Sequence, residues 1–389
     1  MLKKIGYPVV ALMFIYLLTI SIAPTLFEKN LNLVEFKNAR HLSSEAKDFF
    51  DSLSFVADLH CDALLWGRDL TKRSNYGHVD FPRMQEGNVA LEAFTIVTKS
   101  PRGQNFTSNS ADAFDMVTLL NFLQGRGPRQ WFSLYNRAEK QARQLHRLAQ
   151  RYNDEFMLIT SQSDVKRFVD RRKTNKSVIA GFLGIEGAHC LEGKISNVQK
   201  LFEEGVRMMG PTHFFDNELG GSAHGMSGEG LTEFGHQVIK EMNRINMIID
   251  LSHASPKMID DILDLSTRPV IVSHTGVKGT KDSPRNLSDA HIQKIATNGG
   301  LIGVGFFKGA IHGEIVDIVE AIKYVRDLVG IEYVALGSDF DGAATTPIDI
   351  TGMSYIVQGL MDAGFSRNEI KAVMGENIYR FLMKNLPQQ

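Results

Sequence analysis

The sequence has little of what a disulfide scaffold or a strongly charged surface would need. Only two of its 389 residues are cysteine, so the fold must be held by its core or by metal. Lys+Arg number 43 and Asp+Glu 44, a net charge of −1, which excludes an electrostatic surface for nucleic acid or for an anionic membrane. What is present is a hydrophobic fraction of 43% with 22% charged residues, typical of a globular protein with a large core.

The two cysteines, Cys61 and Cys190, are predicted to be packed side chains. Side chains alternate along a strand, so Cys61 points away from its neighbours His60 and Asp62 and is a poor candidate for a thiolate ligand. Cys190 follows a predicted strand and is expected to pack in a loop. The sequence alone also leaves a bridge between the two cysteines open.

The first 30 residues form a predicted targeting segment that lies apart from the fold. Lys3 and Lys4 precede an apolar run, Ile5–Ala23, which at a helical rise of about 1.5 Å is long enough to span the hydrocarbon core of a bilayer. An uncleaved signal anchor is one interpretation. A cleaved signal peptide is the other, because Ser21-Ile22-Ala23 has the pattern of a cleavage site, although Pro24 would hinder processing. Both predict export, with the remaining chain periplasmic or extracellular, either membrane-anchored or secreted.

Residues 44–387 alternate short apolar runs with amphipathic helical patterns, and they are predicted to form one domain. The predicted strands are Phe55–His60, Val89–Val97, Val178–Glu186, Val206–His213, Met247–His253, Val270–His274, Leu301–Phe306 and Tyr333–Asp339. The predicted helices include Arg137–Arg151, Val198–Glu204, Phe234–Asn243, Pro256–Leu265 and Ile315–Leu328. Eight such units predict an α/β fold, a (β/α)8 TIM-type barrel. A further apolar patch, Phe156–Thr160, would be a ninth strand and leaves an open doubly wound sheet as the alternative.

Six of the predicted strands end in an imidazole or a carboxylate. These residues are His60, Glu186, His213, His253, His274 and Asp339. Because the carboxyl ends of barrel strands meet on one face, the six side chains are expected to converge there. Their types suit zinc or a similar transition metal better than calcium or magnesium. His60 and Asp62 are two residues apart on one strand, so both can face the same ion.

Eight ordered motifs between about Phe55 and Leu382 carry a family resemblance. They are Asp58-Leu59-His60-Cys61-Asp62, Val79-Asp80-Phe81-Pro82-Arg83, Gly184-Ile185-Glu186-Gly187-Ala188-His189, Pro211-Thr212-His213, Ile249-Asp250-Leu251-Ser252-His253, Val272-Ser273-His274, Pro284-Arg285-Asn286 and Gly337-Ser338-Asp339-Phe340-Asp341-Gly342. With these motifs the chain resembles the membrane dipeptidase (renal dipeptidase) family of the amidohydrolase superfamily. The resemblance implies a barrel with a dinuclear zinc site at its C-terminal face and hydrolysis of free dipeptides.

The resemblance also implies a ligand set for two Zn²⁺ ions. His60 and Asp62 would bind the first ion, His253 and His274 the second, and Glu186 would bridge both together with a water or hydroxide. A carboxylate suits the bridging position because it reaches both ions and offsets part of their charge. Zinc ions held roughly 4 Å apart lower the pKa of the shared water, which provides a nucleophile at neutral pH.

Three further roles follow from matching positions. Asp339 would accept the proton of the bridging water and deliver it to the leaving amine. His213 would hydrogen-bond the oxyanion that develops on the attacked carbonyl. Arg285 would form a bidentate pair with the free carboxylate of a dipeptide. His189 is a candidate for orienting a ligand, and homodimers are common in the family.

Some residues are predicted to lie outside the chemistry. His78, His224, His236, His291 and His312 are expected to be solvated. The glycine-rich segment Glu218–Gly230 lacks the lysine of a phosphate-binding loop and is expected to be a mobile loop at the mouth of the site. The segment Pro101–Pro128 departs from the family pattern and is a candidate for shaping substrate choice or an oligomer contact.

Two alternative functions differ from the dipeptidase in class. The first is another amidohydrolase-type barrel acting on esters, lactones or phosphotriesters. Many such enzymes carry His-x-His on the first strand and a carboxylated lysine as the bridge, where this chain has Asp62 and Glu186. The second is a catalytically inactive barrel that serves as a binding protein.

Overall fold

The computed structural model describes residues 2–35 and 41–389, without the side chains of residues 2–12, 14 and 15. The strands are β1 (Leu33–Val34), β2 (Val56–Cys61), β3 (Val89–Val97), β4 (Phe156–Leu158), β5 (Ile179–Glu186), β6 (Val206–Met209), β7 (Ile248–Ile249), β8 (Ile271–Thr275), β9 (Leu301–Val304), β10 (Val334–Leu336) and β11 (Thr345–Thr346). The helices are α1 (Leu2–Leu31), α2 (Ser44–Ser52), α3 (Ala63–Trp66), α4 (Phe81–Glu86), α5 (Met116–Leu123), α6 (Pro128–Phe132), α7 (Leu134–Arg151), α8 (Gln162–Thr174), α9 (Ser196–Glu203), α10 (Glu233–Ile245), α11 (Pro256–Leu265), α12 (Asp289–Thr297), α13 (Ile315–Val329), α14 (Met353–Asp362), α15 (Arg367–Lys371) and α16 (Asn377–Asn385).

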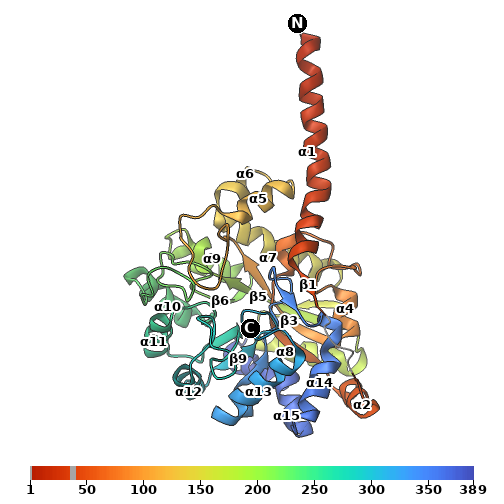
Figure 1. Ribbon diagram of the computed structural model, residues 1–389, viewed down its shortest axis with the longest axis vertical. Helices are drawn as coiled ribbons and strands as arrows, with labels where there is room; N and C mark the ends of the chain where they lie inside the picture. Colours follow the sequence, from red (N-terminus) through yellow and green to blue (C-terminus); the bar gives the residue numbers. More distant parts are fainter. Residues whose placement is uncertain (1, 36–40) are drawn as a thin grey trace.

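Parallel strands at the centre of the molecule are covered by helices on the outside (Figure 1). One sheet has the order β2-β3-β5-β6-β7 and a second the order β10-β9-β8. Two isolated parallel bridges, Asp250 with Ile271 and Cys61 with Phe340, connect β7 to β8 and the chain after β10 to β2. This mixed α/β arrangement, with a parallel half-barrel sheet, is consistent with a TIM-type barrel.

The candidate ninth strand is present, but it does not enter the order of the main strands. β4 pairs with Ile179–Gly181 at the beginning of β5, and β6 pairs with Leu183–Ile185 further along. Since β3 occupies the other edge of β5 along its length, β4 and β6 share one edge, one after the other. The short β4 therefore gives no support to an open doubly wound sheet.

The barrel strands are buried on both faces, as continuous apolar sequences in parallel sheets require. All nine residues of β3 and all eight of β5 are buried. Aromatic side chains fill the layer between β3, β4 and α4, where the ring of Phe156 stacks on Phe81 at 4.7 Å and meets Phe94 edge-on at 6.1 Å.

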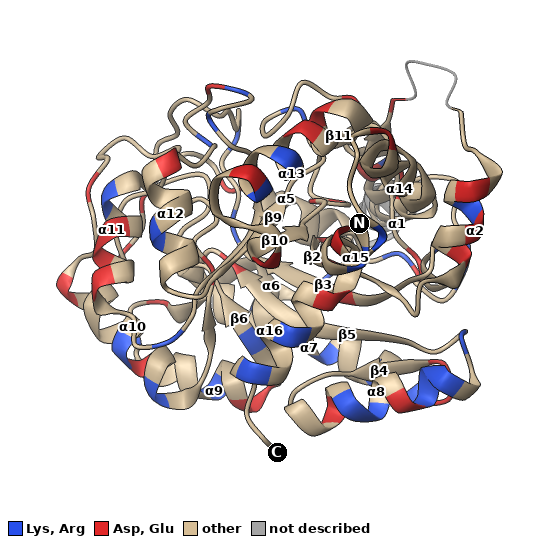
Figure 2. Ribbon diagram, turned by 90° about the horizontal axis from the view of Figure 1, so that it is seen from below, with Lys and Arg blue, Asp and Glu red and all other residues tan. Residues whose placement is uncertain are grey.

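Serine hydroxyls fix the beginnings of several helices around the barrel. The N-cap side chains of Ser133, Ser161, Ser255, Ser288 and Ser366 accept hydrogen bonds from backbone amides of α7, α8, α11, α12 and α15. Each such cap stabilises its helix by about 1 kcal/mol. Basic and acidic residues both occur on outer helices such as α8 and α10 (Figure 2), in keeping with the near-zero net charge.

Several strands are shorter than predicted. β3 matches its predicted bounds, whereas β6, β7 and β10 stop before the polar residue that was expected to end them. The chain turns early at these places, and His253 and Asp339 have φ values of 63° and 64°. A residue with a left-handed backbone conformation cannot continue a strand, so His253 and Asp339 lie on the loops that follow β7 and β10.

The N-terminal helix α1 projects from the body of the molecule (Figure 1). In contrast to the predicted separate segment, its last turns pack on the domain, where the Glu28 side chain is 2% exposed. Among the residues whose side chains are described, 13, 16–35 and 41–389, no helix has both the length and the apolar character needed to cross a bilayer. The side chains of Lys3 and Lys4 lie outside the part of the chain that is described.

Candidate metal centre and active site

The carboxylate of Glu186, at the end of β5, is the centre of a buried polar cluster. Its Oε1 lies 2.9 Å from His253 Nε2, 3.2 Å from His274 Nε2 and 3.6 Å from His60 Nε2. Its Oε2 lies 3.2 Å from His213 Nε2. Four imidazoles from four different strands or their following loops thus face one carboxylate, as the predicted convergence requires.

The first strand contributes two side chains to this cluster. His60 Nε2 lies 3.7 Å from Asp62 Oδ1, so both face the same space from positions two residues apart. Asp62 follows the last residue of β2 and accepts a hydrogen bond of 2.6 Å from the Thr95 hydroxyl of β3. Sequence reasoning did not identify Thr95, because a threonine within an apolar strand gives no signal of its own.

A serine behind the cluster orients two of the imidazoles. The Ser273 hydroxyl donates to Asp250 Oδ2 at 2.6 Å, and the same oxygen lies 2.8 Å from His60 Nδ1 and 3.0 Å from His274 Nδ1. Since the hydroxyl proton goes to Asp250, both Nδ1 atoms donate to the serine oxygen. The Nε2 atoms then direct their lone pairs toward Glu186, which is the tautomer that a metal ligand needs.

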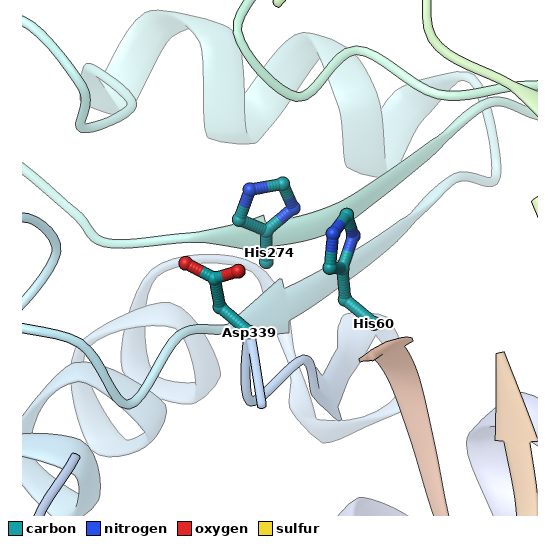
Figure 3. A group of neighbouring side chains, drawn as sticks. All are labelled: His60, His274 and Asp339. Atoms are coloured by element: carbon teal, nitrogen blue, oxygen red, sulfur yellow. The ribbon is translucent and has the colours of Figure 1, made fainter. Parts of the chain in front are cut away.

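Asp339 reaches the cluster from the loop after β10. Its carboxylate lies near the imidazoles of His60 and His274, and the three side chains point toward one another (Figure 3). Asp339 has a left-handed backbone conformation. Three residues later, a Cβ added at Gly342 would lie 2.0 Å from Asp339 Oδ1. A side chain at position 342 would therefore displace the carboxylate.

Burial dominates the electrostatics of the cluster. It raises the pKa of Glu186 well above its ordinary value, with Asp339 adding to the rise and Arg285 opposing it. The pKa values of Asp62 and Asp339 are also raised, by burial first and by a neighbouring carboxylate second. Such mutual repulsion among buried carboxylates is the setting that a bound divalent cation relieves.

The imidazoles shift in the opposite direction. Burial lowers the pKa of His60, His253 and His274 well below the ordinary histidine value, and the positive charge of Arg285 adds to each shift. Burial also lowers the pKa of His213 to about 4. Neutral imidazoles are the form that coordinates metal, so the environment favours ligands over charged side chains.

The residues present fit a metal ion. Three overlapping groups have ligand atoms within 4.8 Å of one another: His60, His274 and Asp339; Glu186, His213 and His253; and His60, Asp62 and Glu186. The buried Nε2 of His60 has no hydrogen-bond partner among the described residues. Neutral nitrogen and carboxylate oxygen donors are typical of zinc and related transition metals. The groups also show that His213 and Asp339 lie as near to the centre as the predicted ligands.

Arg285 is buried beside the cluster. Its side chain is only 4% exposed, its Nη2 donates to the backbone oxygen of His274, and its guanidinium lies 5.6 Å from the ring of Phe307. Burial lowers the pKa of Arg285 to about 10, against the opposing effects of Asp339 and Glu186. Its Nε has no partner within the part of the chain that is described, which leaves a donor for a ligand.

A cavity of about 220 Å³ opens onto the cluster. Glu186, His213, His253 and Asp339 line its polar side, and Phe106, Phe214 and Phe307 line its apolar side. Phe106 and Gln104 come from the segment Pro101–Pro128, which the sequence indicated as a departure from the family pattern. Aromatic residues in loops carry no distinguishing signal, so the other two rings were not predicted.

Two histidines predicted to be solvated are buried. His224 Nδ1 lies 3.0 Å from the Phe106 backbone oxygen, and its ring stacks on Phe214 at 4.9 Å. His78 is fully buried, and its Nδ1 accepts a hydrogen bond from the Asp341 amide at 2.9 Å. The prediction was wrong because polar sequence neighbours say nothing of the distant segments that cover a loop.

Other loop predictions are refined. Both cysteines are buried free thiols, so the bridge between them is absent. His189 packs edge-on against Phe215 at 4.6 Å, and its Nδ1 lies 3.4 Å from the Asn217 amide group. The Glu218–Gly230 loop is held by Asp216, whose carboxylate accepts 2.8 Å hydrogen bonds from the amides of residues 222, 226 and 227.

Sequence comparisons identify the family. Residues 45–386 match the profile of the membrane dipeptidase family, peptidase family M19. A protein of Aspergillus oryzae named dipeptidase aclJ is 27% identical over 353 residues, which cover 84% of this chain and 77% of that protein. Dipeptidase tcpJ of Claviceps purpurea is 28% identical over 323 residues, covering 79% of this chain and 69% of that protein.

Solved structures show the same fold. A metallo peptidase from Rhodobacter sphaeroides, liganded with a phosphinate mimic of the dipeptide L-Ala-D-Ala, superimposes with a TM-score of 0.69 and 23% identity over 86% of this chain and all of that one. The probable dipeptidase PvdM from Pseudomonas aeruginosa gives a TM-score of 0.72 and 18% identity over 88% of this chain and 98% of that one. With a profile match that spans nearly the whole domain, the chain belongs to the membrane dipeptidase family M19 and is a metallo-dipeptidase of that type.

Proposed function

We propose that this enzyme hydrolyses the peptide bond of free dipeptides at a centre that holds two zinc ions. His60 and Asp62 would hold the first ion, His253 and His274 would hold the second, and Glu186 would be shared by both. The observation that carries this proposal is the position of Glu186 Oε1, within 3.6 Å of three imidazole Nε2 atoms, two from β2 and β8 and one from the loop after β7. When bound, zinc lowers the pKa of water and polarises the scissile carbonyl.

Asp339 is the proton carrier in the proposed reaction. Its carboxylate lines the cavity beside the cluster, and its raised pKa suits a group that takes a proton from water and later donates it. The proton goes to the amine nitrogen as the peptide bond breaks, which releases two free amino acids. The left-handed backbone at Asp339 keeps this carboxylate on the cavity side of the loop.

His213 stabilises the developing oxyanion in this proposal. The role needs a proton on Nε2. Nε2 lies 3.2 Å from Glu186 Oε2 and Nδ1 lies 3.3 Å from the Lys99 backbone oxygen, so a hydrogen-bond acceptor faces each ring nitrogen. With the pKa of His213 lowered to about 4, the neutral ring carries a single proton at physiological pH, and the proposed role requires the tautomer with that proton on Nε2.

Arg285 binds the free carboxylate of the dipeptide. A buried guanidinium with an unpartnered Nε gives a strong, directional contact to a carboxylate. Phe106, Phe214 and Phe307 enclose the substrate side chains in a cavity of about 220 Å³, which suits a substrate of two residues. Cleavage from the middle or the end of a long peptide is not expected at such a site.

The N-terminal segment directs export in this proposal. Support comes from the sequence, in which two lysines precede the apolar run Ile5–Ala23. Fractionation of cells that produce the full chain tests it, because recovery of the enzyme from the cytoplasm would contradict export.

Metal content and hydrolysis measured on the same purified full-chain sample test the proposed reaction. We expect about two zinc ions per chain and cleavage of free dipeptides that stops on chelation and returns with zinc. N-acetylated and C-terminally amidated dipeptides should resist, the latter because Arg285 loses its partner. Metal without cleavage, or cleavage unaffected by chelation, would contradict the proposal.

Replacement of Arg285 tests the carboxylate contact separately. Arg285→Lys keeps the charge but loses the planar fork, and Arg285→Met loses both. We expect KM for free dipeptides to rise in that order while zinc content stays unchanged. A variant that loses zinc would show that Arg285 supports the metal centre instead.

A further inference from the structure

The end of α1 contributes a buried charge to the domain. Glu28 Oε1 forms an ion pair with Arg68 Nη1, and Arg68 Nη2 lies 2.5 Å from Asp341 Oδ2. The side chains of Glu28, Arg68 and Asp341 are 2%, 6% and 0% exposed. A carboxylate is costly to bury without a partner, so these three groups hold one another in place.

The carboxylate, the backbone amide and the backbone oxygen of Asp341 all make hydrogen bonds. Its Oδ1 accepts a hydrogen bond of 2.6 Å from the His78 amide, and its own amide donates to His78 Nδ1 at 2.9 Å. Its backbone oxygen accepts from Trp66 Nε1 at 2.6 Å. Although burial alone would raise the pKa of Asp341, the charge of Arg68 and the hydrogen bond from the His78 amide lower it, which keeps the residue ionised beside Arg68.

The loop that carries Asp341 also carries Asp339. Asp339, Asp341 and Ala343 have φ values of 64°, 61° and 55°, so three alternate residues other than glycine adopt the left-handed conformation. Such residues cost of order 1–3 kcal/mol each and persist only where the surroundings hold them. The same loop binds Asp62, whose amide donates to the Phe340 oxygen at 2.8 Å.

The segment after α1 binds this loop as well. β1 pairs in parallel with β11, and the Leu33 amide donates to the Ala344 oxygen at 3.1 Å. The ion pair itself has no spare room, because a Cβ added at Gly77 would lie 2.5 Å from Arg68 Nη1 and 2.9 Å from Glu28 Oε1. Glu28 is thus the point at which the N-terminal helix acts on the Asp339 loop.

We propose that Glu28 is a positioning residue of this enzyme. Through Arg68 it fixes the Asp341 carboxylate, and Asp341 in turn keeps the 339–343 loop in the left-handed backbone that points Asp339 into the cavity. Glu28 touches neither the metal cluster nor the cavity lining. Its effect on the reaction rests on the role proposed above for Asp339, whereas its effect on the loop does not.

The test compares Glu28→Ala in the full chain with Glu45→Ala. Glu45 is a matched control because it also forms an ion pair from a helix, 3.2 Å from Arg367, but with both side chains about two-thirds exposed. Hydrogen exchange is measured on peptides that cover 337–346, where the amides of residues 337, 338 and 340–342 are hydrogen-bonded. Zinc content, kcat, KM and thermal unfolding are measured on the same samples.

For Glu28→Ala we expect faster exchange confined to 337–346 and its contacts, and a kcat about 10- to 100-fold lower, the size of effect that a displaced catalytic group produces. KM and zinc content should change little, because Arg285 and the ligands are untouched. Glu28→Gln keeps the shape of the side chain and should recover part of both losses. Glu45→Ala should resemble the unmodified enzyme.

Other outcomes overturn the proposal. Unchanged exchange at 337–346, or faster exchange spread over the whole domain, would reduce Glu28 to an ordinary stabilising contact. Faster loop exchange with an unchanged kcat would contradict the positioning role. If the unmodified enzyme cleaves no dipeptide, the proposed function fails, but the exchange data still decide whether Glu28 holds the loop.

Discussion

Half of the site stands on strands and half on loops, and the two halves are held differently. His60, Glu186 and His274 belong to β2, β5 and β8, whose registers are set by backbone pairing along the sheet. His213, His253 and Asp339 lie beyond their strands, and the last two have left-handed backbones.

The loop half depends on individual contacts. The His253 backbone oxygen accepts from the Thr212 hydroxyl at 3.1 Å and from the Ala223 amide at 2.8 Å. Asp339 is held through Asp341 and the residues that bind it. The difference teaches that the sheet supplies a fixed set of imidazole and carboxylate side chains, whereas the loops place the remaining groups by contacts that can be changed one at a time.

Glu186→Gln is expected to have the largest effect, since Glu186 contacts both halves. A neutral amide cannot bridge two cations, so we expect zinc content to fall and kcat/KM to drop at least about 1000-fold. Metal analysis and dipeptide hydrolysis measure this, with Glu45→Gln as the control for an exposed glutamate. Full zinc content with an intact rate would show that the two halves do not meet at Glu186.

Asp339→Asn should separate chemistry from metal binding. Asparagine keeps the shape but cannot carry the proton, so we expect kcat to fall about 10²- to 10⁴-fold while zinc content holds. Asp154→Asn, an exposed aspartate, is the control. If Asp339→Asn instead loses zinc, Asp339 belongs with His60 and His274 as a ligand, and the loop half has a metal-binding role.

Asp250→Asn should weaken the strand half without stopping the reaction. Asp250 accepts the Ser273 hydroxyl proton and so fixes the tautomers of His60 and His274. Loss of such support lowers metal affinity about 10- to 100-fold. Rates measured over a series of buffered zinc concentrations should shift to higher zinc and reach nearly the same maximum. A lower maximum with unchanged zinc dependence would contradict this role.

The strand half of the site was predictable from sequence. The apolar run Val89–Val97 is confirmed as β3 at both ends, and His60, Glu186 and His274 lie on strands as predicted. Mainly apolar sequences that end in an imidazole or a carboxylate provide this signal, because burial on both faces favours apolar residues along most of the strand. The metal roles of these residues stay predictions.

The loop half of the site was harder to predict from the sequence. Strand ends at β6, β7 and β10 depend on where pairing stops, and the apolar pattern continues beyond that point. The burial of His78 and His224 depends on Asp341 and Phe106, which are more than 100 residues away in the chain. The attachment of Glu28 to Arg68 could not be predicted, since the N-terminal segment has the composition of a leader rather than of a domain.

Ala343→Gly should give the smallest effect. We expect it to stabilise the protein, whereas most substitutions to glycine destabilise it. Ala343 is exposed with φ 55°, so glycine relieves left-handed strain at the end of the Asp339 loop. The relief of about 1–2 kcal/mol exceeds the entropic cost of glycine, roughly 0.5–1 kcal/mol, so we expect a slight rise in Tm. Ala149→Gly in α7 is the control and should lower Tm, because helix interiors disfavour glycine. A fall in Tm for both variants would mean that the loop conformation carries no strain, and that the two halves of the site differ in contacts alone.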